Sequence, residues 1–240
     1  MIISTMYIKP QFVKNKIYHI YNRGVEKRKV FMNDKDYFRF IHDLFEFNNI
    51  EPVLNTNYYF NPKTMDVEHR YLKTENKKPR KLLVEILIFT LMPNHFHLLL
   101  KQKTENGIVK FMKKLGGGYT NYFNKKYERV GHLFQGKFKA VLLENHSHLL
   151  HLPQYIHLNP LELLNYGCRT SIVRESIEFL ENYRWSSFPD YVGKKNFPSV
   201  TQRGFLLDFF GGEKNYKKET IDCLKNWKTN SKKVKEVILD

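Results

Sequence analysis

Apolar and polar positions change periodicity several times along the chain, and these changes predict an alternation of strands and helices. Residues 17–23 (IYHIYNR) are β-branched and aromatic and stop at Gly24, which is typical of a strand. After Asn33 or Asp34, apolar residues recur up to about residue 47, at offsets of one, four, seven and eight residues from the first of them. This spacing places them on one face of a helix, with the Asn or Asp side chain as its N-cap.

A second pattern predicts two adjacent buried strands. Residues 82–91 form an apolar run interrupted only by Glu85, and residues 95–101 (HFHLLLK) form another. Pro93-Asn94 between them is a turn signal. The segment is therefore predicted to be a β-hairpin.

The second half of the chain returns to helical spacing. Residues 108–123 have helical periodicity, but three consecutive glycines at 116–118 each cost about 1 kcal/mol in a helix. We expect the helix to be broken or closely packed there. Residues 134–143 alternate like a strand, and Ser147 is the expected cap of a further helix that runs to about Asn159.

The resulting order is strand, helix, strand, strand, helix, strand, helix. It predicts an α+β fold, a ferredoxin-like antiparallel sheet with helices packed on one face. We expect one domain over residues 1–193, with 48–81 as an inserted loop or hairpin because it is proline-containing and basic. Residues 194–240 are expected to form a basic helical C-terminal extension.

Composition narrows the class of protein. The 240 residues are 42% apolar and 15% aromatic, which supports a sizeable core and argues against intrinsic disorder. Two cysteines, Cys168 and Cys223, cannot build a disulfide scaffold. No apolar run approaches the roughly 18 residues of a membrane span, and no secretory signal is evident. We therefore expect a cytoplasmic protein without a membrane partner.

The charge indicates an anionic partner. The chain has 40 Lys and Arg against 24 Asp and Glu, a formal charge of +16. Phosphate would neutralise this excess. A solvated, lysine-rich surface is the alternative explanation.

His95 and His97 are the first candidates for chemistry. Side chains alternate along a strand, so both imidazoles lie on one face while Phe96 points to the other. Two imidazoles at this spacing can converge on one metal ion. Ordinary surface or hydrogen-bonded histidines are the alternative.

Tyr155 and Asn159 are the second candidates. In a helix they share one face, four residues apart. The phenol could act as a nucleophile, and the amide oxygen could bind a metal. Alternatively Tyr155 is a core aromatic and Asn159 ends the helix before Pro160. Pro153 belongs in the first turn or bends the helix before the tyrosine.

Together these motifs resemble the HUH single-strand DNA transposases, and within them the REP-associated tyrosine transposases. The resemblance spans about residues 17–193. It rests on a series of segments in the family's order, YNRG (21–24), MPNHFH (92–97), GHLFQGKFKA (131–140), YIHLNP (155–160) and YRWSS (183–187).

The resemblance implies a metal-dependent enzyme that cuts single-stranded DNA next to a hairpin and transfers the strand. By resemblance, His95, His97 and Asn159 hold Mg²⁺ or Mn²⁺. Tyr155 matches the catalytic tyrosine, which forms a 5′-phosphotyrosine intermediate.

DNA contacts are expected along the basic segment 105–139, which has eight basic and two acidic residues. Tyr119 and Tyr122 in this segment are expected to pack beneath the helix. The candidate DNA-binding residues are Asn22, Arg23, Lys113, Lys114, Lys125, Lys126, Arg129 and Lys137. The partner is expected to be single-stranded or hairpin DNA, and the protein a monomer or homodimer.

Two other functions fit the same residues. A metal nuclease could use His95 and His97 to activate water, without a covalent adduct. A catalytically silent hairpin DNA- or RNA-binding protein is the third possibility, and the charge fits all three.

Overall fold

The computed structural model describes residues 10–51, 58–61, 63, 66–69, 80–164 and 173–225. Its strands are β1 (Ile17–Arg23), β2 (Tyr58–Asn61), β3 (Asp66–His69), β4 (Val84–Met92), β5 (His95–Gln102) and β6 (Lys139–Leu142). Its α-helices are α1 (Asp34–Glu46), α2 (Gly107–Lys126), α3 (His146–Leu158), α4 (Val173–Asn182), α5 (Phe188–Tyr191), α6 (Gly204–Phe210) and α7 (Glu213–Lys225). Two short 3-10 segments complete the described part, η1 (Val25–Lys27) and η2 (Asn159–Leu163).

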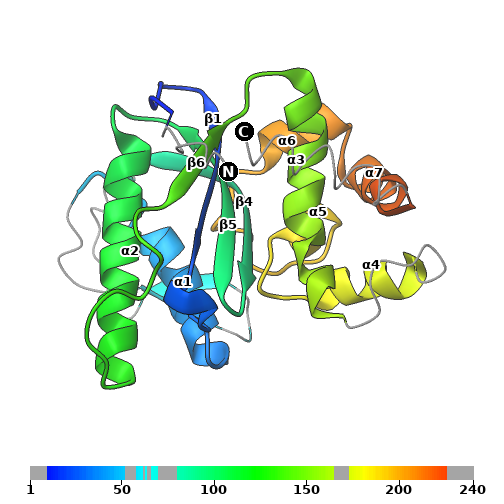
Figure 1. The fold of residues 1–240 in the computed structure, drawn as a ribbon. Coiled ribbons are helices and arrows are strands. Elements are labelled where there is room, and N and C mark those ends of the chain that lie inside the picture. The colour runs from blue at the N-terminus through cyan, green and yellow to red at the C-terminus, as the bar shows by residue number, and fades with distance from the viewer. Residues whose placement is uncertain are drawn as a thin grey trace, which may run out of the picture.

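A four-stranded antiparallel sheet lies at the centre of the molecule (Figure 1). Its strand order is β4-β5-β1-β6, so the first strand of the chain lies between β5 and β6. With β2 and β3 set aside, the order is that of a ferredoxin-like fold. β2 and β3 pair with each other in a separate antiparallel hairpin, inside the segment predicted to be an insertion.

Helices α1 and α2 cover one face of the sheet, on the left in Figure 1. Asn33 caps α1 in a capping box with Asp36, which fixes the helix start. The core on this side contains Ile20, Phe40 and Phe96, all essentially buried. The two layers are held together by side chains from β1, β5 and both helices.

The glycine run does not break α2, which is continuous from Gly107 to Lys126. A Cβ on Gly118 would lie 2.5 Å from the Phe47 ring. Glycine at this position therefore permits α2 to approach the C-terminal end of α1 closely, the second of the two outcomes expected from the sequence. Gly116 and Gly117 face open space instead.

A second helical layer covers the opposite face. Its core joins Leu99 of β5 and Ile156 of α3 to Leu180 and Tyr216 of α4 and α7. The predicted α+β, ferredoxin-like class is therefore confirmed. The sequence predicted helices on one face only, whereas the structure also has helices on the other face, namely α3, α4, α5, α6 and α7 (Figure 1). In the described part of the chain, no helix has the length and apolarity needed to cross a membrane.

Helix α3 is fastened to this layer by buried polar contacts. His157 Nδ1 lies 2.7 Å from the Tyr216 hydroxyl, and its Nε2 lies 2.8 Å from Ser187 Oγ. Thr220 donates to Gln154 Oε1 at 2.6 Å. Both ends of these bonds are buried, so α7 positions α3 with directional as well as apolar contacts.

Two local predictions need correction, and a third, the position of Pro153, is decided between its two alternatives. Asn145, not Ser147, caps α3, because its side chain accepts a hydrogen bond from the backbone N–H of His148. Strand β6 occupies only Lys139–Leu142, since Phe134 forms an isolated bridge with Gly24. Pro153 lies well inside α3 rather than in its first turn.

The extension 194–240 contains α6 and α7, the helices expected in it. Its residues 226–240 lie outside the described residues.

Candidate active site

A cavity of about 500 Å³ opens on the α3 side of the sheet, and it collects the four residues predicted to carry chemistry. His95 and His97 reach it from β5, Tyr155 from α3 and Asn159 from the start of η2. The remaining lining residues are Tyr21, Asn22, Arg23, Gln135, Lys139 and Glu162. Residues 64 positions apart in the chain are thus brought to one place.

His95 has both ring nitrogens in polar contact. Its Nδ1 lies 2.6 Å from Asn94 Oδ1, and its Nε2 lies 3.2 Å from Asn159 Oδ1. Burial lowers the pKa of His95, although the contact with Asn159 opposes this shift. In the tautomer whose Nδ1–H donates to Asn94, the Nε2 lone pair points towards Asn159.

His97 is buried and contacts a third histidine. Its Nδ1 lies 2.8 Å from Nε2 of His19, and the two rings stack with centroids 5.0 Å apart. Burial lowers the pKa of His97 well below its ordinary value, with smaller effects from His19 and His95. Burial also lowers the pKa of His19 to about 3. All three imidazoles are therefore neutral near pH 7, which is the form that binds metals.

The His19 contact determines which nitrogen of His97 is available. When His97 Nδ1–H donates to His19 Nε2, the His97 Nε2 lone pair remains for the cavity. In that arrangement the proton of His19 is on its Nδ1, which is buried and has no hydrogen-bond partner. The opposite tautomer would place a proton on His97 Nε2 and block it as a ligand.

Tyr155 is half-buried beside these histidines. Its ring lies edge-on to the His97 ring, with centroids 6.3 Å apart. Burial raises the pKa of Tyr155 above 10, Glu162 raises it further, and a hydrogen bond with Asn159 lowers it. The phenol is therefore protonated near neutral pH, and loss of its proton needs help from a cation or a base.

The side chains present fit a divalent cation. The separation of 3.2 Å between His95 Nε2 and Asn159 Oδ1 is close to the ~3 Å expected between adjacent ligands of an octahedral ion with bonds of about 2.1 Å. Two imidazoles and an amide oxygen suit Mn²⁺ and are compatible with Mg²⁺. Among the described residues, no group of three His, Cys, Asp or Glu side chains could hold a metal, so the amide of Asn159 is essential to this set.

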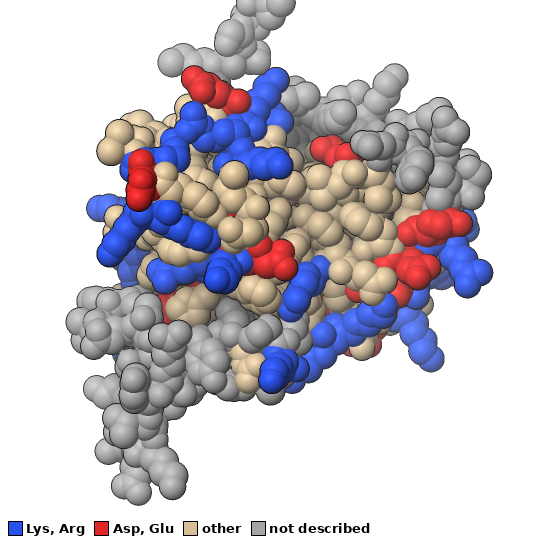
Figure 2. All heavy atoms as spheres, turned by 90° about the horizontal axis from the view of Figure 1, so that it is seen from below, with Lys and Arg blue, Asp and Glu red and all other residues tan. Residues whose placement is uncertain are grey.

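The predicted DNA-binding residues fall into two groups. Asn22 and Arg23 line the cavity, and Lys113 and Lys137 line a second cavity on the α2 side. Lys125 is exposed at the end of α2. Figure 2 looks onto the lower end of α2 and shows Lys and Arg side chains crowded on that side of the molecule.

The other three candidates have partners within the protein. Lys114 donates to the backbone carbonyls of Asn49 and Glu51. Lys126 pairs with the buried Asp36. Arg129 donates to Asn124 Oδ1 at 3.1 Å. These contacts give the side chains structural roles, and a role in DNA binding stays a prediction.

Two residues in or next to the cavity, His19 and Glu162, were not identified from the sequence as part of the site. His19 lies 78 positions from His97, and the only local signal is that it shares a face of β1 with Tyr21 and Arg23. Glu162 follows Asn159 in the 3-10 segment η2, which begins at Asn159 and has Pro160 in its first turn. Recognition of Glu162 would have required the prediction that this turn, rather than the end of the helix, faces the histidines.

Comparisons with known proteins agree with this geometry. Residues 48–159 match the sequence family described as "Transposase IS200 like". That match contains His95, His97, Tyr155 and Asn159. Among solved structures, a REP-associated tyrosine transposase bound to a REP hairpin is similar, with 13% identity and a TM-score of 0.50. The similarity covers 87% of this chain and 97% of the other, and it supports the shared fold. No curated protein matches the sequence.

Proposed function

From the premise that residues 48–159 place the chain in the IS200-like transposase family, we propose a specific reaction. Family membership implies a transposase, an enzyme that binds and cleaves DNA. The proposed activity is metal-dependent cutting of single-stranded DNA beside a hairpin and transfer of the cut end, through a 5′-phosphotyrosine on Tyr155. The observation that carries this proposal is the convergence of Tyr155, His95, His97 and Asn159 on one cavity.

Several residues in and next to the cavity have roles that follow from their positions. His95, His97 and Asn159 would hold Mg²⁺ or Mn²⁺. A bound divalent cation supplies positive charge that offsets the charge developing on the scissile phosphate. His19 holds His97 in the tautomer that presents Nε2. Arg23 and Lys139, both exposed at the cavity, bind the backbone phosphates of the strand.

The covalent step is an in-line displacement at phosphorus. The Tyr155 phenol loses its proton, and its oxygen forms a bond to the phosphorus atom. The bond from phosphorus to the 3′ oxygen breaks, and this oxygen takes up a proton to become a free 3′-hydroxyl. The phosphotyrosine keeps the phosphodiester energy, so a second 3′-hydroxyl can reverse the step and join a new end.

A covalent-capture assay tests this proposal. Labelled hairpin oligonucleotides with single-stranded flanks are incubated with the protein and Mn²⁺ and separated on a denaturing gel beside Tyr155→Phe. We expect a protease-sensitive adduct with the wild type only, and similar hairpin binding by both proteins. Cleavage without an adduct in the wild type would support the nuclease that activates water. Equal cleavage by Tyr155→Phe would overturn the assignment.

A further inference from the structure

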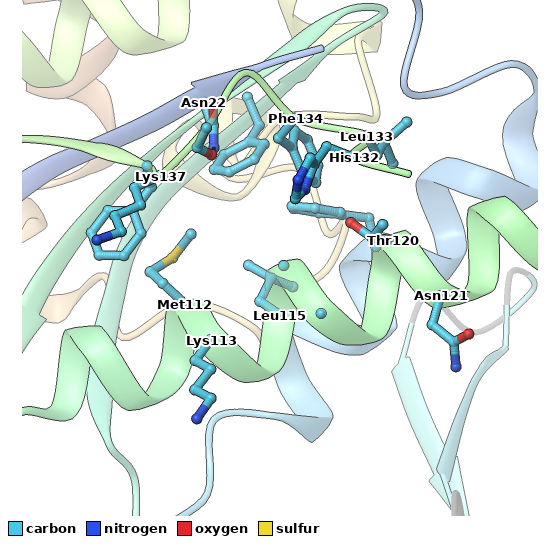
Figure 3. A pocket seen from close by; sticks show the side chains of 16 residues that line it. Asn22, Met112, Lys113, Leu115, Thr120, Asn121, His132, Leu133, Phe134 and Lys137 are labelled. Carbon is cyan, nitrogen blue, oxygen red and sulfur yellow. Dashed lines mark hydrogen bonds between the residues drawn. The ribbon is translucent and has the colours of Figure 1, made fainter. Parts of the chain in front are cut away.

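A second cavity, of about 450 Å³, lies on the opposite face of the sheet from Tyr155, between α2 and the loop of residues 131–138 (Figure 3). We name it the α2 groove. Figure 3 shows Met112, Leu115 and Thr120 rising from α2 towards it, with Phe134 opposite. Its volume falls within the 300–1,000 Å³ that is typical of sites for small molecules.

The walls of the α2 groove combine aromatic and polar groups. Phe40 and Phe96 form its floor and are buried, whereas Phe138 is half-buried at its edge. Asn22 and His132 add polar groups, and both are at least partly exposed. Flat apolar surfaces edged by amides and an imidazole suit a planar heterocycle with hydrogen-bonding edges.

Two glycines keep the α2 groove open. A Cβ on Gly116 or on Gly117 would meet no atom within 4 Å, although both residues line the groove in the middle of a regular helix. Gly118 is explained by its contact with Phe47, but packing does not explain the other two. Glycine is unfavourable inside a helix, and this cost is offset if the uncovered helix surface accommodates a ligand.

The α2 groove and the active-site cavity share one lining residue. Asn22 lines both, near the end of β1, where it donates to the backbone carbonyl of Gly136 at 3.2 Å. Lys137 lies at one end of the groove in Figure 3, and the surrounding segment 105–139 has eight basic and two acidic residues. A polyanionic strand that leaves the Tyr155 cavity would therefore meet this groove next.

We propose that the α2 groove binds an unpaired nucleobase of the DNA strand whose scissile phosphate lies in the Tyr155 cavity. This inference rests on the proposed function for the identity of the strand. The base enters beside Asn22, stacks on the aromatic wall and lies over the uncovered backbone of α2. Recognition of one base thus takes place on one face of the sheet and cleavage on the other.

The test uses fluorescent hairpins with a four-thymidine single-stranded flank, placed on the 5′ side in one set and on the 3′ side in another. One flank position at a time is made abasic or replaced by 5-iodouracil. We expect a single position at which loss of the base weakens binding about tenfold. At that position, photocrosslinking should label Met112, His132, Phe134 or Phe138.

The matched variants are Gly117→Leu and Gly204→Leu. Both glycines have open surroundings, but only Gly117 lines the groove. Gly117→Leu should fold normally, bind the intact hairpin about tenfold more weakly and lose its sensitivity to the abasic position. Gly204→Leu, at the start of α6, should behave like the wild type. The inference is overturned if Gly117→Leu retains the abasic effect or if crosslinks fall only outside the groove.

The outcomes separate this inference from the proposed function. A Tyr155 adduct without any abasic effect would overturn the nucleobase site alone. An abasic effect without an adduct would overturn the strand-transfer mechanism and leave a base-binding groove. Absence of hairpin binding by the wild type would overturn both.

Discussion

Both faces of the central sheet carry a hydrophobic core, but the two faces are built for different tasks. On the α3 face, polar side chains are buried and specifically paired, as His97 with His19 and His157 with Tyr216. On the α2 face, aromatic and aliphatic side chains form the core and buried carboxylates such as Asp36 and Asp43 lie on α1, while Gly116 and Gly117 leave the groove uncovered. The comparison teaches that reactive groups need fixed orientations, whereas a stacking surface needs only shape. Variants on the two faces should therefore fail in different ways.

Loss of His97, the proposed cation ligand, should give the largest effect. His97→Ala, or treatment of the wild type with a chelator, should reduce cleavage by more than about 100-fold, because charge stabilisation by a metal supplies several kcal/mol. Hairpin binding should persist. Gel-based cleavage and fluorescence anisotropy measure the two properties, with His146→Ala at the exposed start of α3 as the control. Undiminished cleavage in chelator would refute metal dependence.

Removal of the buried imidazole of His157 should be the most damaging change to stability. His157→Leu leaves the Tyr216 hydroxyl without its partner and removes one of the contacts of Ser187 Oγ, which keeps those to the Phe89 backbone; we expect a loss of about 3 kcal/mol in the free energy of unfolding. Urea denaturation measures it. Tyr216→Phe removes one bond only and should cost less. If both variants are as stable as the wild type, α3 is not anchored by these contacts.

His19 sharpens the comparison, because it is as buried as any core residue yet serves the site. His19→Leu should lower the affinity for Mn²⁺ by about 10- to 100-fold, the usual cost of removing a group that orients a metal ligand. Titration calorimetry with Mn²⁺ measures this without reference to activity. An unchanged Mn²⁺ affinity, with a lowered melting temperature, would make His19 purely structural.

Asp36 is a buried carboxylate of α1, on the α2 face, and it should respond to pH. Burial alone would raise its pKa, but hydrogen bonds from Lys126, Tyr127, Met32 and Tyr122 outweigh this and lower the pKa below 3.8. A lowered folded-state pKa means that the carboxylate stabilises the protein above pH 3.8 and that this stabilisation is lost as the pH falls further.

Asp36→Asn should therefore cost about 1–3 kcal/mol near pH 7 and flatten the acid side of the stability curve. Urea unfolding between pH 7 and pH 3 measures both. A variant curve parallel to that of the wild type would exclude Asp36 as the titrating group.

The smallest effects should distinguish the three glycines of α2. Gly116→Ala should stabilise the protein by about 0.5–1 kcal/mol, because alanine favours helix and meets no neighbour. Gly118→Ala should destabilise it by about 1–3 kcal/mol through overlap with Phe47. Thermal unfolding of the pair provides the check. Equal effects at the two positions would contradict the packing described for Gly118.

Sequence reasoning succeeded where local periodicity carries the information. The bounds of β1 at residues 17–23 and the shared face of His95 and His97 follow from strand alternation, and both agree with the structure. It failed where a partner lies far along the chain. The sequence alone predicts that Lys126 is a cation available to DNA. In the structure it pairs with Asp36, which lies 90 positions away in the chain. The sequence alone identifies His19 only as a residue of a strand. The pairing of β1 with β5 is what brings it next to His97.

The bonds from α3 to α7 also set an order of events during synthesis. Tyr216 is made 59 residues after His157, which corresponds to about 3–12 s at 5–20 residues per second. Until then the sheet can form, but the helix that carries Tyr155 lacks its anchor. A chain released before residue 216 would therefore contain the histidines of the cavity but lack the contact that anchors the helix carrying Tyr155. The site proposed for DNA cutting would therefore be complete only after Tyr216 has been made.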